Sequence, residues 1–487
     1  MRTSNPVQPI IPVVNKEEIP AHWNLVPIGD ICASVAKVQP KDNPTVGFKY
    51  IDISGIDNKR FMVAETKAYY GNNAPSRARQ LVREGDIIFS TVRTYLKNMA
   101  RITRELDGEV ASTGLCVLRP KAPEYSGYLY YYLQYEPFLN ELAKFQRGTS
   151  YPAVRDGDVF AQLIPVPSKQ EAACIVAEIE KQFSRLDEAV AGLKRIKANL
   201  KRYKAAVLKA AVEGRLTAQW RQEHFDVEPA SDLLKRILAE RKKKWEEKNP
   251  GKKYREPVAP DTSNLPELPK GWVWATTDQL FSFVTSGSRG WASYYSDSGP
   301  LFLRMGNLDH DTIKLDLSDI QRVQPPAGTE GMRTRVKSGD ILISITADVG
   351  MVGLIPDGFE EAYINQHIAL VRPETLNAIY LAWFLACKNG QDQLNGLQRG
   401  ATKVGLGLDD IKAVNVPLPP LKEQTAIIQE IDCIFSVADE IEAIIESDLK
   451  RAERLRQAVL RFAFSGELSS VNKSTIDSAI LLEGAKP

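Results

Sequence analysis

The sequence lacks the features of a membrane protein or a disulfide-framed secreted protein. No stretch of its 487 residues approaches the roughly 18 consecutive apolar residues that a membrane span requires. Residues 1–19 contain several prolines and no apolar run of signal-peptide length, so the sequence predicts a cytoplasmic protein. The cysteines are few and scattered, without a Cys-x-x-Cys pair, which favours small buried side chains over disulfides or a zinc site: Cys32, Cys116, Cys174, Cys387 and Cys433.

Catalytic motifs are also missing. The sequence has neither the G-x-x-x-x-G-K-[S/T] loop of a nucleotide-driven motor nor the Asn-Pro-Pro-aromatic motif of adenine methyltransferases. Gly405-Leu406-Gly407 lacks a third glycine and indicates a loop rather than a cofactor site. The acids that follow Pro356 lack the lysine of a nuclease cluster, because Ala362 stands in its place. We therefore expect no catalytic residues and no metal site in this chain.

The four histidines show no spacing typical of metal ligands. His367 is notable because it lies beside Asn365 and Gln366, and the three side chains could read base edges. A satisfied polar residue close to a strand is the interpretation that the sequence favours.

Positive charge is scarce overall but concentrated in one place. The 63 Lys and Arg residues against 61 Asp and Glu residues give a net charge of +2. Non-specific DNA affinity comes from neutralised phosphates, so this balance poorly matches a protein that binds nucleic acid alone. Residues 192–221, however, contain nine basic residues and one acidic residue. This basic stripe fits either a solvated helix face or a DNA-binding protein that borrows affinity from partners.

An internal repeat organises the chain, whose length predicts about three domains. Residues 164–216 align without a gap on residues 416–468, at a constant offset of 252, and 18 of the 53 positions are identical. Looser echoes precede them, such as Gly85–Ser90 with Gly339–Ser344. The sequence therefore predicts two copies of a divergent globular unit, each followed by a better-kept helix.

Each predicted helix carries an apolar stripe with steps of three or four residues, as in a coiled coil. Prolines precede each stripe, and Gly214 and Gly466 stand where the helices should end. The two helices most simply pair with each other; the alternative is that each packs on its own domain. The stripes are Ile179, Phe183, Leu186, Val190, Leu193, Ile196, Leu200, Tyr203 and Val207, and Ile431, Phe435, Ala438, Ile441, Ile445, Leu449, Ala452, Leu455 and Val459.

The globular units have the pattern of mixed α+β domains in which strands predominate. Residues 47–53 and 340–345 read as strands, and residues 125–145 and 376–394 have helical periodicity. Between the two copies, residues 217–267 predict an exposed charged helix and a proline-rich connector rather than a DNA hook.

Two strings of the second copy carry a family resemblance. Residues 416–424 read Val-Pro-Leu-Pro-Pro-Leu-Lys-Glu-Gln and lead into Ile427-x-x-Glu-Ile and Phe435-x-x-x-Asp; residues 456–460 and 465–468 read Arg-Gln-Ala-Val-Leu and Ser-Gly-Glu-Leu. These strings resemble the specificity subunit of type I restriction-modification enzymes, and the resemblance spans nearly the whole chain. In the first copy, Ser-Lys-Gln-Glu-Ala at 168–172 replaces the usual Pro-Leu-x-Glu-Gln, while the rest of the register holds.

The resemblance implies two target-recognition domains whose helices form an antiparallel coiled coil, which spaces the domains and docks methyltransferase subunits. It implies a complex with double-stranded DNA, two methyltransferase (M) subunits and, through them, the restriction (R) motor subunits, for adenine methylation or cleavage. S-adenosylmethionine, ATP and magnesium would belong to these partners, and this chain would hold no cofactor. The implied division is a tail (1–18), the first domain (19–167), its helix (168–216), a linker (217–267), the second domain (268–420), its helix (421–468) and a tail (469–487).

Two readers on a rigid spacer predict an interrupted target, because sites about 34 Å apart lie one turn apart on the same face of DNA. Because the two readers have diverged, the target should also be asymmetric. Three alternatives remain. A stand-alone regulator with two readers would bind tightly by itself. A fused endonuclease-methyltransferase is opposed by the missing motifs. A coiled-coil scaffold would not need two elaborate domains.

Residues that read DNA should be polar or basic and lie on loops beside the matched elements. In the first domain these are the residues after the Gly85–Ser90 string and those around residue 150. In the second domain they are the matched places and three outliers. The predicted set is Thr91, Arg93, Thr94, Tyr95, Lys97, Arg147, Thr149, Ser150 and Tyr151, then Thr346, Asp348, Arg399, Thr402 and Lys403, with Arg289, Arg304 and Asn307 as the outliers.

Overall fold

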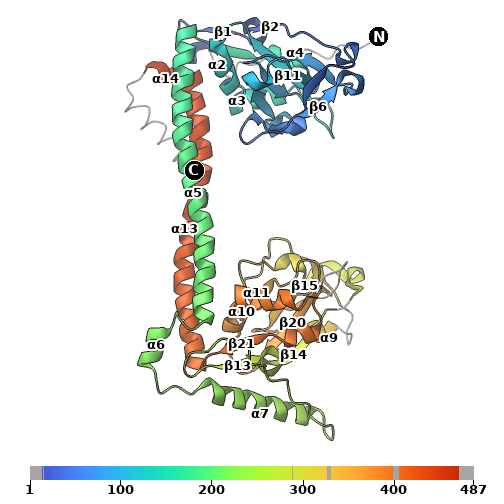
Figure 1. Cartoon of the computed structure of the whole chain (residues 1–487), viewed down its shortest axis with the longest axis vertical. Helices are drawn as coiled ribbons and strands as arrows, with labels where there is room; N and C mark the ends of the chain where they lie inside the picture. Colours follow the sequence, from blue (N-terminus) through green and yellow to red (C-terminus); the bar gives the residue numbers. More distant parts are fainter. Residues whose placement is uncertain (1–13, 15, 288, 326–330, 399–404, 471–487) are drawn as a thin grey trace. The chain divides into compact units, whose positions relative to one another are not determined.

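The computed structural model describes residues 14, 16–287, 289–325, 331–398 and 405–470. The chain divides into two compact units: residues 1–195 with 444–487, and residues 196–443. Helices α5 (Lys169–Val212) and α13 (Leu421–Phe464) both continue from one unit into the other (Figure 1). None of the helices in the described parts of the chain contains an apolar stretch that could span a membrane.

The first unit has two four-stranded sheets, in the orders β6-β3-β10-β7 and β2-β11-β8-β9, and the two-stranded pairs β1-β12 and β4-β5. Its strands are β1 (Asn24–Pro27), β2 (Cys32–Ala33), β3 (Gly47–Ile51), β4 (Ile56–Asp57), β5 (Met62–Val63), β6 (Lys67–Tyr70), β7 (Ala78–Leu81), β8 (Ile87–Ser90), β9 (Met99–Arg101), β10 (Val110–Ser112), β11 (Leu115–Pro120) and β12 (Leu163–Val166). Its short helices are α1 (Ile28–Ile31), α2 (Glu124–Tyr132), α3 (Glu136–Ala143), α4 (Asp156–Phe160) and, after α13, α14 (Glu467–Ser470).

The second unit has a four-stranded sheet in the order β14-β20-β17-β18, a three-stranded sheet β16-β15-β19 and the pair β13-β21. Its strands are β13 (Val273–Thr276), β14 (Phe281–Ser286), β15 (Tyr295–Leu303), β16 (Arg322–Val323), β17 (Ile341–Ser344), β18 (Val352–Leu354), β19 (Ala362–Ile364), β20 (Ile368–Pro373) and β21 (Asn415–Leu418). Its short helices are α6 (Ala218–Glu223), α7 (Ala230–Lys248), α8 (Thr277–Leu280), α9 (Gly331–Thr334), α10 (Ala378–Ala386), α11 (Lys388–Gly396) and α12 (Leu408–Lys412).

Strands β8 and β17 explain the apolar part of the echoed strings. Successive side chains of a strand point to opposite faces of its sheet. Ile87 and Phe89 lie in the core beneath α2 and α3, whereas Ile88 lies in a separate core on the other face. Ile341 and Leu342 divide between two cores in the same way. A strand that is covered on both faces needs an uninterrupted apolar run, which both copies have.

The aspartate of each echoed string anchors a neighbouring strand. Asp86 is buried and accepts two hydrogen bonds from Arg119, at 2.9 and 2.7 Å, which raise the pKa of Arg119 above its usual value. Asp340 is buried and accepts the matching pair from Arg372, both at 2.6 Å. Together with the strand orders, these bonds confirm the predicted fold class of two similar, strand-rich α+β domains, each followed by a long helix.

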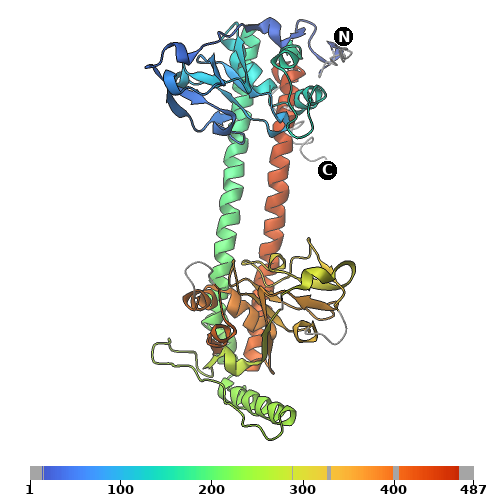
Figure 2. The same ribbon diagram turned by 90° about the vertical axis from the view of Figure 1, so that its right-hand side faces the viewer.

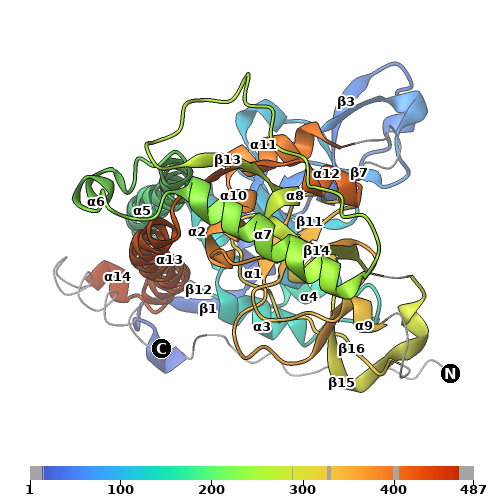
Figure 3. The ribbon, with the colours of Figure 1, turned by 90° about the horizontal axis from the view of Figure 1, so that it is seen from below.

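Three local predictions were wrong in part. The helical patterns at 125–145 and 376–394 are each two short helices rather than one; Pro137 at the start of α3 accounts for the first break. Helix α7 is not exposed on all sides, because Leu233 and Ile237 of its apolar stripe join the core of the second unit. Figure 3 shows α7 crossing beside α8. Two cysteines, Cys174 and Cys433, are exposed rather than buried.

The two long helices pack against each other in antiparallel directions. In the first unit Arg456 of α13 pairs with Asp187 of α5. In the second unit Lys197 pairs with Glu442 at 3.4 Å, while Lys204 pairs with Asp439 at 2.6 Å. As the residue number rises along α5, its partner's number falls along α13, which defines the antiparallel direction.

Both helices end just before a left-handed glycine, Gly214 (φ 70°) or Gly466 (φ 82°). Figure 2 shows α5 in green and α13 in red.

The apolar stripes are not continuous. The predicted seam residues Ile179, Phe183, Ile431, Ala438 and Ile445 are buried, and Leu186, Val190, Leu193 and Phe435 are half-buried. Ile196 (50%), Tyr203 (53%) and Ile441 (38%), however, are exposed. In the second unit, the ion pairs of Lys197 and Lys204 join the helices in this stretch.

The basic stripe of residues 192–221 is neutralised within the fold. Six of its nine cations form ion pairs with carboxylates of α13, of the second domain or of the stripe itself. Burial alone would lower the pKa of Lys204, but Asp439 and Glu442 raise it above its usual value. The stripe is therefore not simply a solvated helix face, since most of its charge serves internal contacts; whether the chain borrows DNA affinity from partners stays a prediction. The paired cations are Lys197, Lys201, Lys204, Lys209, Arg215 and Arg221.

Candidate DNA interface and helix anchors

Two loops of the first domain come together where β8 ends. The backbone N–H of Arg93 donates to Pro152 O at 2.7 Å, and that of Val154 donates to Thr91 O at 2.8 Å. We call residues 91–97 and 147–154 the first loop pair. The fold thus brings together all the candidates that the sequence predicted in this domain.

The uncharged candidates of the first loop pair divide into exposed and buried side chains. Tyr95 (59%) and Tyr151 (72%) are exposed, as are Thr149 and Ser150. Thr91 and Thr94 are buried. The hydroxyl of Thr91 donates to Gly114 O at 3.2 Å, and that of Thr94 accepts from Gln146 at 2.5 Å. The two buried threonines shape the loops, while the exposed side chains remain available to a ligand.

The cations of the first loop pair are held in place by neighbours. Two hydrogen bonds to Asp158, at 2.5 and 3.3 Å, raise the pKa of Arg147 above its usual value. Lys97 pairs with Glu136 at 3.2 Å. The guanidinium of Arg93 lies over the ring of Tyr151, 4.8 Å from its centroid. Fixed cations of this kind suit directional hydrogen bonding better than mobile surface charges do.

The second domain builds the corresponding loops with the same bonds. The backbone N–H of Leu406 donates to Ile345 O at 2.9 Å, as Val154 does to Thr91, and Thr346 forms a β-bridge with Gly405, as Val92 does with Ala153. We call residues 345–348 and 405–406 the second loop pair. The candidates Arg399, Thr402 and Lys403 lie outside the described residues.

The candidates of the second loop pair are bonded to histidines. The Thr346 hydroxyl lies 2.5 Å from Nδ1 of His367, and the Asp348 carboxylate lies 2.8 Å from Nε2 of His310. His367 also lies 2.8 Å from the amide nitrogen of Gln366, so it is the satisfied polar residue that the sequence favoured.

The three outliers have different settings. Arg289 is exposed. Arg304 pairs with Asp319 at 3.0 Å. Asn307 is 3% exposed and donates to the carbonyls of Asp316 (2.8 Å) and Asp319 (3.0 Å), so its amide closes a loop. Among the described residues, no hydrogen bond joins Arg304 or Asn307 to the second loop pair.

Two serines that sequence reasoning missed support the loop pairs. Ser90 and Ser344 end β8 and β17 and are buried. The hydroxyl of Ser90 donates to Val92 O at 2.9 Å, and that of Ser344 donates to Asp348 O at 2.6 Å. The signal was present in the sequence, because both serines close the echoed strings.

The Glu-Gln of the family string anchors the second domain to its helix. The buried carboxylate of Glu423 accepts hydrogen bonds from Thr217 (2.8 Å), Arg221 (2.7 Å) and Trp272 Nε1 (2.8 Å). Gln424 donates to Pro419 O at 2.9 Å and accepts from the backbone N–H of Asn377 at 3.0 Å. These bonds join the start of α13 to the segment after α5, to the domain entry and to α10.

The first copy keeps this architecture despite its departure from the family string. Ala172 stands where the second copy has Gln424. The hydroxyl of Tyr125 donates to Pro167 O at 2.9 Å, the carbonyl that corresponds to Pro419 O. Three residues further along α2, the hydroxyl of Tyr128 donates to Pro165 O at 2.8 Å, as that of Tyr380 does to Pro417 O at 2.6 Å. A tyrosine has therefore replaced the glutamine bond.

Removal of the Arg221 guanidinium should destabilise the second unit. Arg221→Ala leaves the carboxylate of Glu423 buried without its charged partner, and breaking a buried ion pair costs about 3–5 kcal/mol. Because the Thr217 and Trp272 donors remain, we expect a loss of about 3 kcal/mol. Urea unfolding measures it, and Lys235→Ala, which breaks an exposed pair with Asp232, is the matched control with little expected change. Equal effects of the two variants would contradict the anchor.

One phenylalanine on each long helix anchors a domain to the helix pair. Phe183 packs edge-on against Tyr131 of α2, with ring centroids 5.6 Å apart, and lies beneath the guanidinium of Arg456 at 4.4 Å. Phe435 repeats the arrangement with Trp383 of α10 at 5.2 Å and Lys204 at 5.8 Å. Each ring thus contacts its own domain and the opposite helix.

Truncation of these rings should be costly in proportion to their burial. Phe183 is 6% exposed, so Phe183→Ala should lower the free energy of unfolding by about 3–5 kcal/mol through lost transfer energy and the cavity left behind. Phe435 is half-buried, and Phe435→Ala should cost less. Tyr203→Ala on α5, whose side chain is 53% exposed, is the control. A loss for Tyr203→Ala as large as that for Phe183→Ala would overturn this assignment.

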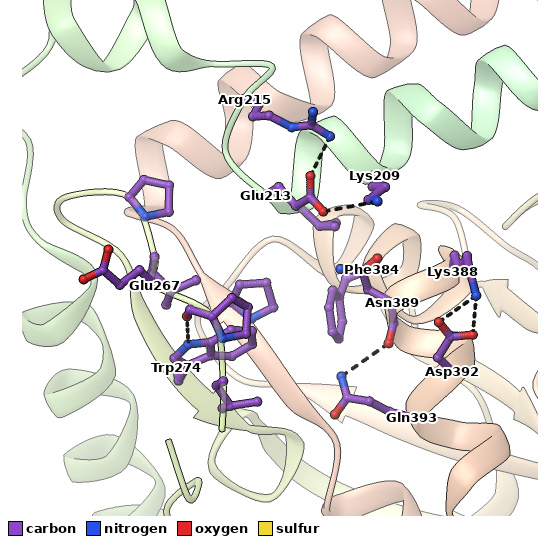
Figure 4. Close-up of a pocket in the computed structure, with 16 residues that line it drawn as sticks. Lys209, Glu213, Arg215, Glu267, Trp274, Phe384, Lys388, Asn389, Asp392 and Gln393 are labelled. Carbon is purple, nitrogen blue, oxygen red and sulfur yellow. Dashed lines mark hydrogen bonds and ion pairs between the residues drawn. The ribbon is translucent and has the colours of Figure 1, made fainter. Parts of the chain in front are cut away.

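The second unit also contains a cavity of about 600 Å³ where α5 ends (Figure 4). Val212, Trp274 and Phe384 give it an apolar lining. Five of the six charged residues that line it are paired with each other, Glu213 with Lys209 and Arg215, and Asp392 with Lys388; Glu267 is the sixth. Such a lining suits an apolar side chain rather than a metal ion or a phosphate. Among the described residues, no group of His, Cys, Asp and Glu could hold a metal ion.

Comparison with known proteins identifies the class. The family of type I restriction modification DNA specificity domains matches residues 20–202 and 332–451, more than half of the chain. The chain belongs to this family. It is the non-catalytic DNA specificity subunit of a type I restriction-modification system, with two target-recognition domains.

Two relatives are similar along almost their whole length. The EcoKI specificity subunit of Escherichia coli K12 is 22% identical over 482 residues, which cover 93% of this chain and 90% of that protein. The StySPI specificity subunit of Salmonella potsdam is 20% identical over 470 residues, covering 94% and 91%.

Solved structures show the same fold. One, from work on complex assembly and conformational transition of the type I R-M system, is 27% identical with a TM-score of 0.68, covering 92% of this chain and 99% of that chain. The HsdS subunit from Thermoanaerobacter tengcongensis is 28% identical with a TM-score of 0.50, covering 92% and 98%.

Proposed function

We propose that this subunit reads an asymmetric, bipartite DNA target, with one domain for each half-site. The observation that carries the proposal is the pair of loop frameworks, which are built from the same backbone bonds and present different side chains. The first loop pair presents Arg93 and Tyr151, whereas the second presents Thr346 and Asp348 bonded to histidines. Equal frameworks with unequal side chains should bind DNA in similar poses and select different bases.

The two domains and their helices would occupy the ranges expected from the sequence: residues 19–167 and 268–420 as readers, with helices at 168–216 and 421–468. The long helices would set the distance between the half-sites and dock two M subunits, through which R subunits join. The M subunits would flip the target adenine out of the duplex and hold S-adenosylmethionine, while ATP and magnesium would serve the motor. The similarity of this chain to a structure from work on complex assembly of the type I R-M system supports this proposal. The protein would act in phage defence in the cytoplasm.

Binding of the purified chain, alone and with its M subunits, tests this function. Internal pairing involves six of the nine cations of the basic stripe, so we expect weak binding by the chain alone and a large gain on addition of M subunits. The chain alone should neither methylate nor cleave DNA. Tight, sequence-specific binding without any gain from M subunits would favour the stand-alone regulator instead.

A further inference from the structure

We propose that position 93 is the base-reading position of the first loop pair, that position 347 is its counterpart in the second, and that Arg93 reads a guanine in the major groove. The inference rests on the proposed DNA-reading role of the loop pairs. It adds which residue of the first domain determines the DNA sequence preference at one position, and which base that residue selects.

The backbone singles out these two positions. Arg93 (φ 49°) and Ala347 (φ 62°) adopt the left-handed conformation that residues other than glycine rarely take. Each is the third residue after the buried serine that ends its strand, Ser90 or Ser344. Five residues other than glycine share this conformation in the described part of the chain, and two of the five fall at these matched positions. A strained conformation kept in two diverged domains is a mark of a functional position.

The side chain of Arg93 is poised for a ligand. Its guanidinium lies over the exposed ring of Tyr151, and Nη2 donates to Ser150 O at 3.3 Å. That is the one hydrogen bond its side chain makes within the described residues, and the buried Nε has no partner there. A guanidinium carries five N–H donors, so most of them remain unfilled. The ring contact holds the group in place before binding, which lowers the entropy lost on recognition.

Guanine is the base that this group fits best. The fork of donors on arginine matches O6 and N7 of guanine in the major groove, the most common specific contact between proteins and DNA. Ala347 offers no donor at the corresponding position. The second loop pair must therefore select a different feature there, which accounts for unequal half-sites on one framework.

The test compares Arg93→Lys, Arg93→Ala and Tyr151→Ala in the full chain, assembled with its M subunits. Binding is measured against target duplexes in which each base pair of both half-sites is replaced in turn, at two salt concentrations. Arg93→Lys keeps the charge but loses the fork. It should lose the preference for guanine at one position of the first half-site, a change of about 10- to 100-fold, while other positions keep theirs. Tyr151→Ala should weaken the same preference by a smaller factor without altering the Arg93 backbone.

Arg60→Lys, at an exposed arginine of the first domain outside both loop pairs, is the matched control, and it should leave the guanine preference of the first half-site unchanged. Arg93→Ala could instead weaken binding to all duplexes equally and lower the salt dependence of binding by about one phosphate contact. In that case Arg93 contacts the phosphate backbone of the DNA and the inference is wrong. An unchanged preference at every position would also overturn it. If the complex with the unaltered chain shows no sequence preference, the proposed function itself fails, so the two failures are distinguishable.

Discussion

Exchange of the second domain should replace one half of the DNA target and leave the other half unchanged. In the chimaera, residues 268–420 are replaced by the corresponding region of the EcoKI specificity subunit, with Trp272 retained. Trp272 must stay because its indole N–H donates to the buried Glu423, which anchors the domain to α13. The effect should be complete rather than graded, because all the candidate reading residues of that domain change together.

The reciprocal exchange of residues 19–167, with Trp23 retained, provides the control. It should alter the other half-site and no more. Mapping of methylated adenines in cells that produce each chimaera with M subunits reports both halves at once. A chimaera that folds and methylates DNA but changes both half-sites would show that the two domains do not read independently.

Lengthening of both long helices should widen the gap between the half-sites. Insertion of seven residues after Arg195 in α5 and seven after Ala443 in α13 adds about 10 Å at 1.5 Å per residue, roughly three base pairs of B-DNA. The insertion points lie where the two compact units divide, close to the exposed Ile196 and Ile444. The buried contacts of Phe183 and Phe435 are therefore left intact. We expect the spacer to grow while both half-site sequences stay the same.

Insertion into α5 alone is the matched control for this experiment. It would shift the ion pairs of Lys197 and Lys204 out of register with α13, so it should impair folding or activity rather than lengthen the spacer. An active double-insertion variant with an unchanged spacer would show that the helices do not set the distance.

The repeat made much of the fold predictable. A stretch of 53 residues that recurs with 18 identities predicts two helices with the same surroundings, and the matched contacts of Phe183 and Phe435 follow from it. The buried strands β8 and β17 were visible as matched apolar runs. The interruption of the apolar stripe at Tyr203 was not predictable, because periodicity does not reveal that neighbouring lysines find carboxylate partners on the opposite helix.

The candidate site was predictable only as a region. Loops next to matched strands indicated where DNA should bind, and the fold gathers residues 91–97 and 147–154 as expected. The roles of Thr91, Thr94 and Asn307 could not be predicted from the sequence, because the residue type does not distinguish an exposed polar side chain from a buried one that closes a loop. Nor does sequence show a positive φ at Arg93 and Ala347, where no glycine marks the turn.

The pattern of methylated adenines in the genome of cells that make this chain with its M subunits tests the central claim most directly. The proposed function predicts a single asymmetric motif, with two different specified half-sites separated by a fixed number of unspecified base pairs. A continuous motif, or a palindrome with identical halves, would contradict two independent readers held at a fixed distance.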